Sequence, residues 1–137
     1  MSNNTFYALH SSNNTSHYQT LGGNGDEIVE ADLDGDGSTD YVVYLGSIAH
    51  SLAGTWYWRL SSESYATEHS RLFGLDFSHD HAAPGDYDGD GKTDLAVRRR
   101  TGEFPGFYVR RSSDSEVTFQ RWGLVDDAVL ATTVHTR

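Results

Sequence analysis

The feature that most constrains the fold is a motif that occurs three times along the 137 residues. Each copy begins with two adjacent aromatic residues, continues with Ser-Ser five positions after the first aromatic, and ends with an apolar residue followed by Gly. The copies begin at Phe6, Trp56 and Phe107, so the motif recurs after 50 and then 51 residues. Self-similarity at such a period indicates one supersecondary unit that is used repeatedly.

Each repeat unit contains four short segments that are rich in β-branched and aromatic residues and are bounded by Gly, Ser, Asn or Asp. We expect strands at 27–31, 40–45, 55–60 and 68–73 in one unit, and at 82–85, 94–99, 106–110 and 118–122 in the next. A last strand is expected at 129–134. No stretch keeps a helical period over 11 residues or more, so little helix is predicted.

Four short strands per unit of about 50 residues predict an all-β fold, a β-propeller of four-stranded blades. The chain is interpreted as a single repeat domain, 1–137, with a partial blade (1–25), two blades (26–74 and 75–123) and a terminal strand (124–137). A two-sheet sandwich is disfavoured because it leaves the repeats unexplained. With about 2.5–3 blades per chain, against four to eight in a propeller, we expect self-association to complete the ring. The alternative is that the chain is part of a longer protein.

Two loops with the pattern D-x-D-G-D-G-x-x-D, at 32–40 and 86–94, lie in register with the repeat. Calcium takes six to eight oxygen ligands, mostly carboxylate and carbonyl, and Gly at position 6 permits the tight turn that such a loop needs. The predicted ligands of two Ca²⁺ sites are Asp32, Asp34, Asp36, the Ser38 carbonyl and Asp40, and Asp86, Asp88, Asp90, the Lys92 carbonyl and Asp94. Solvated acidic turns are the alternative, but four carboxylates in nine residues repel one another without a cation.

These loops differ from an EF-hand, which requires Glu at position 12 and flanking helices. Position 12 is Val43 in the first loop and Val97 in the second, and an alternating apolar segment follows each loop. Both loops are therefore expected to connect strands.

The Asp loops, together with the aromatic-Tyr, Ser-Ser and apolar-Gly steps, resemble the FG-GAP or VCBS-type repeat over about residues 5–130. This family includes the calcium-binding blades of integrin α-subunit propellers and many bacterial surface and secreted proteins. The resemblance implies the same ten metal ligands and an ion that stiffens the blade without catalysing a reaction. The calcium prediction favours an extracellular or cell-surface location, because sites with the affinity of extracellular modules would be largely empty in cytosol, although no signal peptide is visible in this chain.

Composition narrows the remaining function classes. The net charge of -10 makes the chain a poor general binder of nucleic acid. The absence of cysteine excludes disulfides and thiol catalysis, and no apolar run approaches the ~18 residues of a membrane span, so we expect no membrane insertion. The basic cluster Arg98–Arg100, with Arg110 and Arg111, is predicted to occupy solvent-facing strand positions. His79, Asp80 and His81 are expected in an exposed polar loop, with a zinc site as the alternative.

We expect a recognition module that mediates protein–protein or adhesive binding and is no enzyme. A lectin with repeated sugar sites is the alternative, since exposed aromatic side chains can stack on sugars. An enzyme on a propeller scaffold is a third hypothesis, but the chain has no Gly-x-Ser-x-Gly elbow and no phosphate-binding loop. The repeated Tyr7, Tyr57 and Tyr108 are predicted to pack between blades, with Trp56 and Trp58 on the opposite strand face from Tyr57.

Overall fold

The computed structural model describes residues 4–46, 51–124 and 127. Within these residues, ten strands form three antiparallel sheets, and the helical content is a single 3-10 turn, Ser61–Glu63. The first sheet is a hairpin of β1 (Thr5–Leu9) and β2 (Ser16–Thr20). The second contains β3 (Glu27–Ala31), β4 (Asp40–Leu45), β5 (Thr55–Arg59) and β6 (His69–Leu72). The third contains β7 (Asp80–Ala82), β8 (Leu95–Arg99), β9 (Gly106–Arg110) and β10 (Val117–Gln120). The all-β prediction is confirmed.

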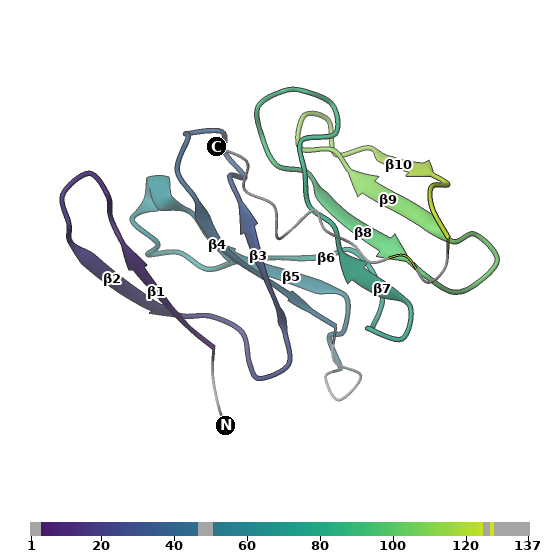
Figure 1. Cartoon of the computed structure of the whole chain (residues 1–137), viewed down its shortest axis with the longest axis horizontal. Coiled ribbons are helices and arrows are strands. Elements are labelled where there is room, and N and C mark those ends of the chain that lie inside the picture. The colour runs from purple at the N-terminus through teal and green to yellow at the C-terminus, as the bar shows by residue number, and fades with distance from the viewer. Residues whose placement is uncertain (1–3, 47–50, 125–126, 128–137) are drawn as a thin grey trace.

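Each of the two larger sheets is a meander in which every strand pairs with the next one along the chain, in the orders β3-β4-β5-β6 and β7-β8-β9-β10. Antiparallel neighbours need only short connections, and the Gly- and Asp-rich segments supply them. The three sheets lie side by side in chain order (Figure 1).

The central strand β4 is buried along its whole length because sheets cover both of its faces. Successive side chains of a strand point to opposite faces. Tyr41 and Val43 belong to the cluster beneath the hairpin, with Leu21, whereas Val42 and Tyr44 belong to the cluster shared with the third sheet. One strand therefore contributes to both cores.

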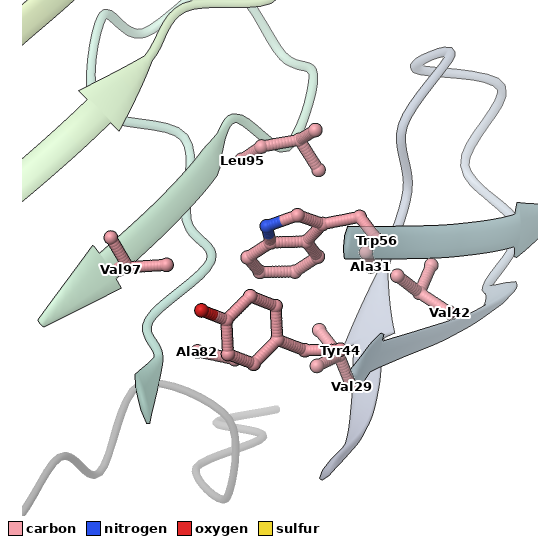
Figure 2. Packing of buried hydrophobic residues seen from close by; sticks show 8 residues of the cluster. All are labelled: Val29, Ala31, Val42, Tyr44, Trp56, Ala82, Leu95 and Val97. Atoms are coloured by element: carbon pink, nitrogen blue, oxygen red, sulfur yellow. The ribbon is translucent and has the colours of Figure 1, made fainter. Parts of the chain in front are cut away.

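The larger core fills the gap between the second and third sheets. Trp56 and Tyr44 project from the second sheet toward Val97 and Ala82 of the third (Figure 2). The Trp56 indole N–H donates to the Phe73 carbonyl at 2.8 Å, which satisfies the polar atom that burying a tryptophan would otherwise leave unpaired. Burial of this aromatic pair joins two sheets that share no ladder.

The apolar-Gly step at the end of each sheet leads into a turn that an aspartate side chain holds. Gly74 has φ +128°, and a Cβ there would lie 2.4 Å from the Tyr44 hydroxyl oxygen, so a side chain would clash with the core. An aspartate then accepts the backbone N–H of the residue that follows the Gly. The pairs are Gly23 with Asp26 at 2.6 Å, Leu75 with Asp80 at 2.9 Å, and Leu124 with Asp127 at 2.7 Å.

Most predicted strands are found where the sequence places them, with shifts of one or two residues at several ends. The exception is the strand expected at 82–85, because β7 covers Asp80–Ala82 and pairing resumes only at the single bridge between Gly85 and Asp94. Pro84 lacks the backbone N–H that a ladder needs. The strand expected at 129–134 lies outside the described residues.

Two predictions about side-chain orientation are wrong in part. Tyr57 and Tyr108 pack between sheets as expected, but Tyr7 is 83% exposed, since no described sheet lies against the outer face of the hairpin. Arg98 is buried and not solvent-facing, and its guanidinium donates to the Leu124 carbonyl at 2.6 Å.

Candidate metal centre

Two groups of three carboxylates lie in the loops between β3 and β4 and between β7 and β8. Asp32, Asp34 and Asp36 each offer a carboxylate oxygen, and these oxygens lie within 4.8 Å of one another. The second group, which meets the same criterion, consists of Asp86, Asp88 and Asp90. The structure therefore brings together positions 1, 3 and 5 of both loops.

The first aspartate of each loop organises the turn around itself. Asp32 Oδ1 accepts the backbone N–H groups of Gly35 at 2.7 Å and Asp36 at 3.1 Å, and Oδ2 accepts that of Gly37 at 2.9 Å. Gly37 has φ +84°, a conformation that a side chain would strain. Asp86 accepts the equivalent N–H groups at the same three distances.

The Ser-Ser step supports the other two carboxylates of each group. Ser61 Oγ donates to Asp36 Oδ2 at 2.9 Å, and Ser62 Oγ donates to Asp34 Oδ2. In the third sheet, Ser112 donates to Asp90 at 3.0 Å and Ser113 donates to Asp88 at 2.6 Å. Sequence analysis identified Ser-Ser as part of the repeat but predicted no role for it. Its occurrence together with an Asp loop in both complete units could have indicated that the two interact.

Asp40 and Asp94, at position 9, are not brought into these groups. Asp40 accepts the backbone N–H groups of Leu33 at 2.7 Å and Ser61 at 2.8 Å, one on each oxygen. Burial raises the pKa of Asp40 above its ordinary value. Asp94 is held in the same way by Tyr87 and Ser112. Each aspartate thus fastens its loop to the Ser-Ser turn, and its role as a metal ligand stays a prediction.

The backbone of position 7 also takes part in the loop. The N–H groups of Ser38 and Lys92 donate at 2.8 Å to the carboxylates of Asp36 and Asp90, respectively. A metal bond from either carbonyl remains a prediction. The Lys92 side chain lies over Gly35 of the first loop, since a Cβ at Gly35 would lie 3.1 Å from Lys92 Cγ.

The two loops are joined to each other. The Thr93 backbone N–H donates to the Asp32 carbonyl at 2.7 Å, and the Asp32 N–H donates to the Thr93 hydroxyl at 3.0 Å. This pair of bonds links the second and third sheets at the end where both groups of carboxylates lie.

The donors present fit a hard divalent cation. Every ligand available in the two groups is oxygen, the donor type that calcium prefers. The hydrogen bond from Ser113, together with smaller contributions, lowers the pKa of Asp88, so this carboxylate is ionised at neutral pH. A bound calcium would be held by Asp32, Asp34 and Asp36, or by Asp86, Asp88 and Asp90, and would supply positive charge that relieves their mutual repulsion.

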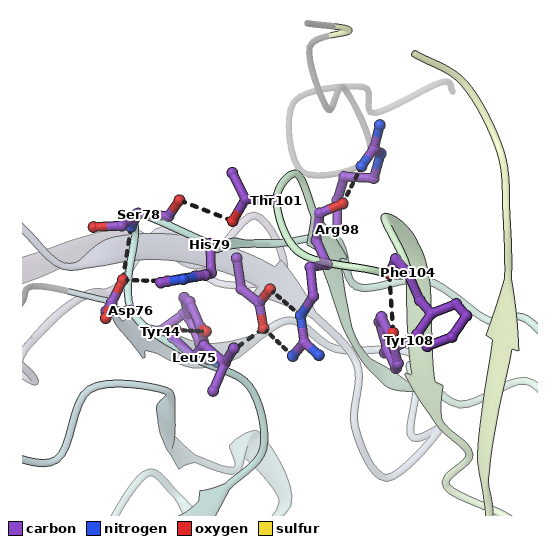
Figure 3. Close-up of polar contacts among 11 residues, drawn as sticks. Tyr44, Leu75, Asp76, Ser78, His79, Arg98, Thr101, Phe104 and Tyr108 are labelled. Carbon is purple, nitrogen blue, oxygen red and sulfur yellow. Dashed lines mark hydrogen bonds and ion pairs between the residues drawn. The ribbon is translucent and has the colours of Figure 1, made fainter. Parts of the chain in front are cut away.

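The segment with His79, Asp80 and His81 is no exposed loop. Asp80 begins β7, and its buried carboxylate accepts two bonds from Arg99, both at 2.8 Å. His79 binds Asp76 at 3.0 Å (Figure 3). Among the described residues, metal-compatible groups are confined to the two Asp loops, so the geometry does not support the zinc alternative.

The comparison with known families agrees with this geometry. The family model for the FG-GAP-like repeat matches residues 32–97. Residues 32–97 are thus similar to an FG-GAP-like repeat. The matched segment runs from Asp32, the first residue of the first loop, to Val97 in the strand after the second loop, and it confirms the resemblance seen in the sequence.

The FG-GAP-like repeat indicates a protein-interaction module of the β-propeller type. The chain matches no curated protein and no solved structure. In the part of the chain that the structure describes, no helix has the length and apolar character needed to cross a bilayer.

Proposed function

We propose that the protein is a calcium-stabilised recognition module that binds protein partners in an adhesive role, without enzymatic activity, outside the cell or at its surface. The observation that carries the proposal is the pair of Asp loops, which repeat the same hydrogen bonds to within a few tenths of an ångström. Extracellular modules bind calcium with a Kd on the order of 10⁻⁴–10⁻³ M, an affinity that suits calcium outside cells and leaves such a site largely empty in cytosol.

Bound calcium would stabilise the contacts between segments at one end of the sheets. In each loop, the carboxylates that face the ion are also bonded to the Ser-Ser turn after the third strand of the same sheet. The loops are joined to each other through Thr93 and Asp32. An ion in either loop would therefore hold three segments that are distant in the sequence.

Thermal unfolding with 2 mM calcium or with chelator tests this proposal. A ligand that binds only the folded state stabilises it by RT ln(1 + [L]/Kd), which is roughly 0.6–1.8 kcal/mol per site for the affinities above. We expect calcium to raise the Tm of the wild type and to have little effect on the double variant Asp34→Asn, Asp88→Asn. An equal response of both proteins, or no response of the wild type, would contradict the calcium sites.

Self-association is the second part of the proposal, and it is supported by the two end faces of the stack of sheets. Tyr57 and Tyr108 pack against the preceding sheet, but the equivalent Tyr7 is 83% exposed. At the other end, Leu21 and Phe73 pack against the following sheet, but the equivalent Trp122 is 72% exposed. Within the described residues, each end of the stack therefore exposes a surface whose equivalents in the repeat are buried between neighbouring sheets.

Light scattering at several protein concentrations tests whether a second copy of the chain covers these end faces. We expect a mass of two or more chains for the wild type, and a single chain for Tyr7→Arg and for Trp122→Arg, because a buried charge without a partner is costly. Leu52→Arg, at an exposed apolar residue between β4 and β5 of the middle sheet, is the matched control. A wild-type protein that stays monomeric across the concentration range would overturn the self-association.

A further inference from the structure

Two crevices occupy equivalent positions in the repeat, each between one sheet and the Asp loop and Ser-Ser turn of the next. The first crevice lies between the hairpin and the second sheet, has a volume of about 320 Å³, and is lined by residues that include His10, His17, Asp36, Ser38 and Tyr65. The second crevice lies between the second and third sheets and measures about 150 Å³. Its lining includes Trp58, Arg71, Thr93, Arg110, Ser112 and Ser115.

The second crevice gathers positive charge from both sheets. Arg71 of β6 is opposite Trp56, which faces the third sheet, and Arg110 of β9 is opposite Leu95, which faces the second sheet. Both guanidinium groups therefore face the same gap. Neither side chain makes a hydrogen bond or an ion pair with any residue that the structure describes, whereas the neighbouring Arg111 is paired with Asp114 and Glu116.

Two guanidinium groups without a partner among the described residues thus line one crevice of a chain whose net charge is -10. Two positive side chains on one crevice repel each other, and an anion between them would offset that repulsion and accept charge-assisted hydrogen bonds from both. The first crevice has the same place in the repeat but carries Asp36 and no arginine. The pair of arginines is therefore a feature of the second crevice and not of the repeat itself.

The remaining lining suits a sugar ring better than a bare ion. The half-buried Trp58 indole stacks on His69, with ring centroids 5.7 Å apart, and presents an apolar surface inside the crevice. Thr93, Ser112 and Ser115 line the same crevice, and the hydroxyls of the first two also bond Asp32 and Asp90. Apolar contact with a few placed polar groups is the usual composition of a small-molecule site. The volume is below the range of about 300–1,000 Å³ for drug-sized ligands, so it suits one ring.

We infer that the second crevice binds a carboxylate-bearing sugar unit, with the carboxylate between Arg71 and Arg110 and the ring against Trp58. The inference goes beyond the proposed function, since it adds a sugar ligand to the protein partners proposed above. Thr93 and Ser112 border both the crevice and the second calcium loop, but Arg71, Arg110 and Trp58 lie outside the loops, so the two proposals fail in different experiments.

Isothermal titration calorimetry in 2 mM calcium tests the inference, with glucuronate as the probe and glucose as the uncharged ring of similar shape. We expect saturable binding of glucuronate and at least tenfold weaker binding of glucose. Arg71→Gln and Arg110→Gln should each weaken glucuronate binding about tenfold or more, because each removes a charge-assisted hydrogen bond. Arg121→Gln, an exposed arginine outside the crevice, should leave it unchanged.

Several results would overturn the inference. These are unchanged binding in both arginine variants, equal binding of glucose and glucuronate, and tighter binding of inorganic sulfate or of a Gly-Asp-Gly peptide than of glucuronate. Loss of binding in Asp88→Asn with retention in Arg71→Gln would place the sugar at a calcium loop instead. Arg71 is exposed and makes no contact that folding depends on among the described residues, so its variant carries the test if Arg110→Gln fails to fold. A calcium-dependent Tm in the same samples reports on the loops separately.

Discussion

At the scale of single residues, the chemistry of the site depends on side chains whose partners are distant in the sequence. Ser112 and Ser113 lie in the turn after β9, yet their hydroxyls donate to Asp90 and Asp88 in the loop before β8. Such bonds fix the carboxylates in one orientation before an ion binds. A preorganised oxygen cage loses less side-chain entropy on binding than a flexible one.

Removing these hydroxyls should weaken calcium binding at the second loop. For the double variant Ser112→Ala, Ser113→Ala, we expect calcium affinity at that loop to fall about threefold to tenfold, in line with the modest net free energy of a hydrogen bond. Calorimetric calcium titration measures the change. The control is Ser70→Ala, an exposed serine on β6. Equal affinities in wild type and variant would show that the Ser-Ser turn plays no part in positioning the carboxylates.

At the scale of elements, one buried ion pair holds the short strand β7 to β8. Asp80 opposes Arg99 in the ladder, and its fully buried carboxylate accepts the Arg99 Nε–H and Nη2–H at 2.8 Å each, as well as the Leu75 N–H. The Arg99 guanidinium stacks over the Tyr108 ring, 4.3 Å from its centroid. A strand of three residues is thus fixed by its side chains as much as by its ladder.

Loss of the Asp80 charge should destabilise the fold. Breaking one partner of a buried ion pair costs about 3–5 kcal/mol, and we expect Asp80→Asn to fall at the lower end, about 3 kcal/mol, because the Arg99 side chain is partly solvent-exposed. Urea unfolding measures this free energy. Asp76→Asn, at a partly exposed carboxylate of the preceding loop, is the control, and we expect its urea midpoint to stay close to that of the wild type. A wild-type midpoint for Asp80→Asn would refute the structural role of the pair.

At the scale of the whole molecule, the two cores are coupled because β4 contributes alternate side chains to both. Tyr41 and Val43 pack beneath the hairpin, and Val42 and Tyr44 pack against the third sheet. The sheets of a repeat protein contact only their neighbours, and its stability depends on those interfaces. A change in one core is therefore expected to reach the other through β4.

This coupling predicts a single unfolding transition. Val43→Ala, in the core beneath the hairpin, should lower stability by roughly 2 kcal/mol and shift the transition of Trp56, which lies in the other core. Tryptophan fluorescence and far-ultraviolet circular dichroism, followed through the same urea titration, should give coincident curves. Separate curves, or a tryptophan transition that Val43→Ala leaves in place, would show that the sheets unfold independently.

The sequence by itself determined the repeat, most strands, and the grouping of positions 1, 3 and 5 in each Asp loop. These features follow from local chemistry: the alternation of a strand fixes which side chains share a face, and a nine-residue loop with Gly at the turn keeps its carboxylates close. The match of residues 32–97 to the FG-GAP-like repeat rests on the same local pattern.

Only the tertiary structure decided which faces are covered and which side chains meet across the gaps between sheets. It showed Asp40 and Asp94 fastening the loops, the Ser-Ser turns bonded to the carboxylates, Arg98 buried and Tyr7 exposed. It also placed Arg71 and Arg110 on one crevice although they lie in different sheets. Spacing along the chain cannot give these contacts, because each depends on which sheet lies against a strand and at what register.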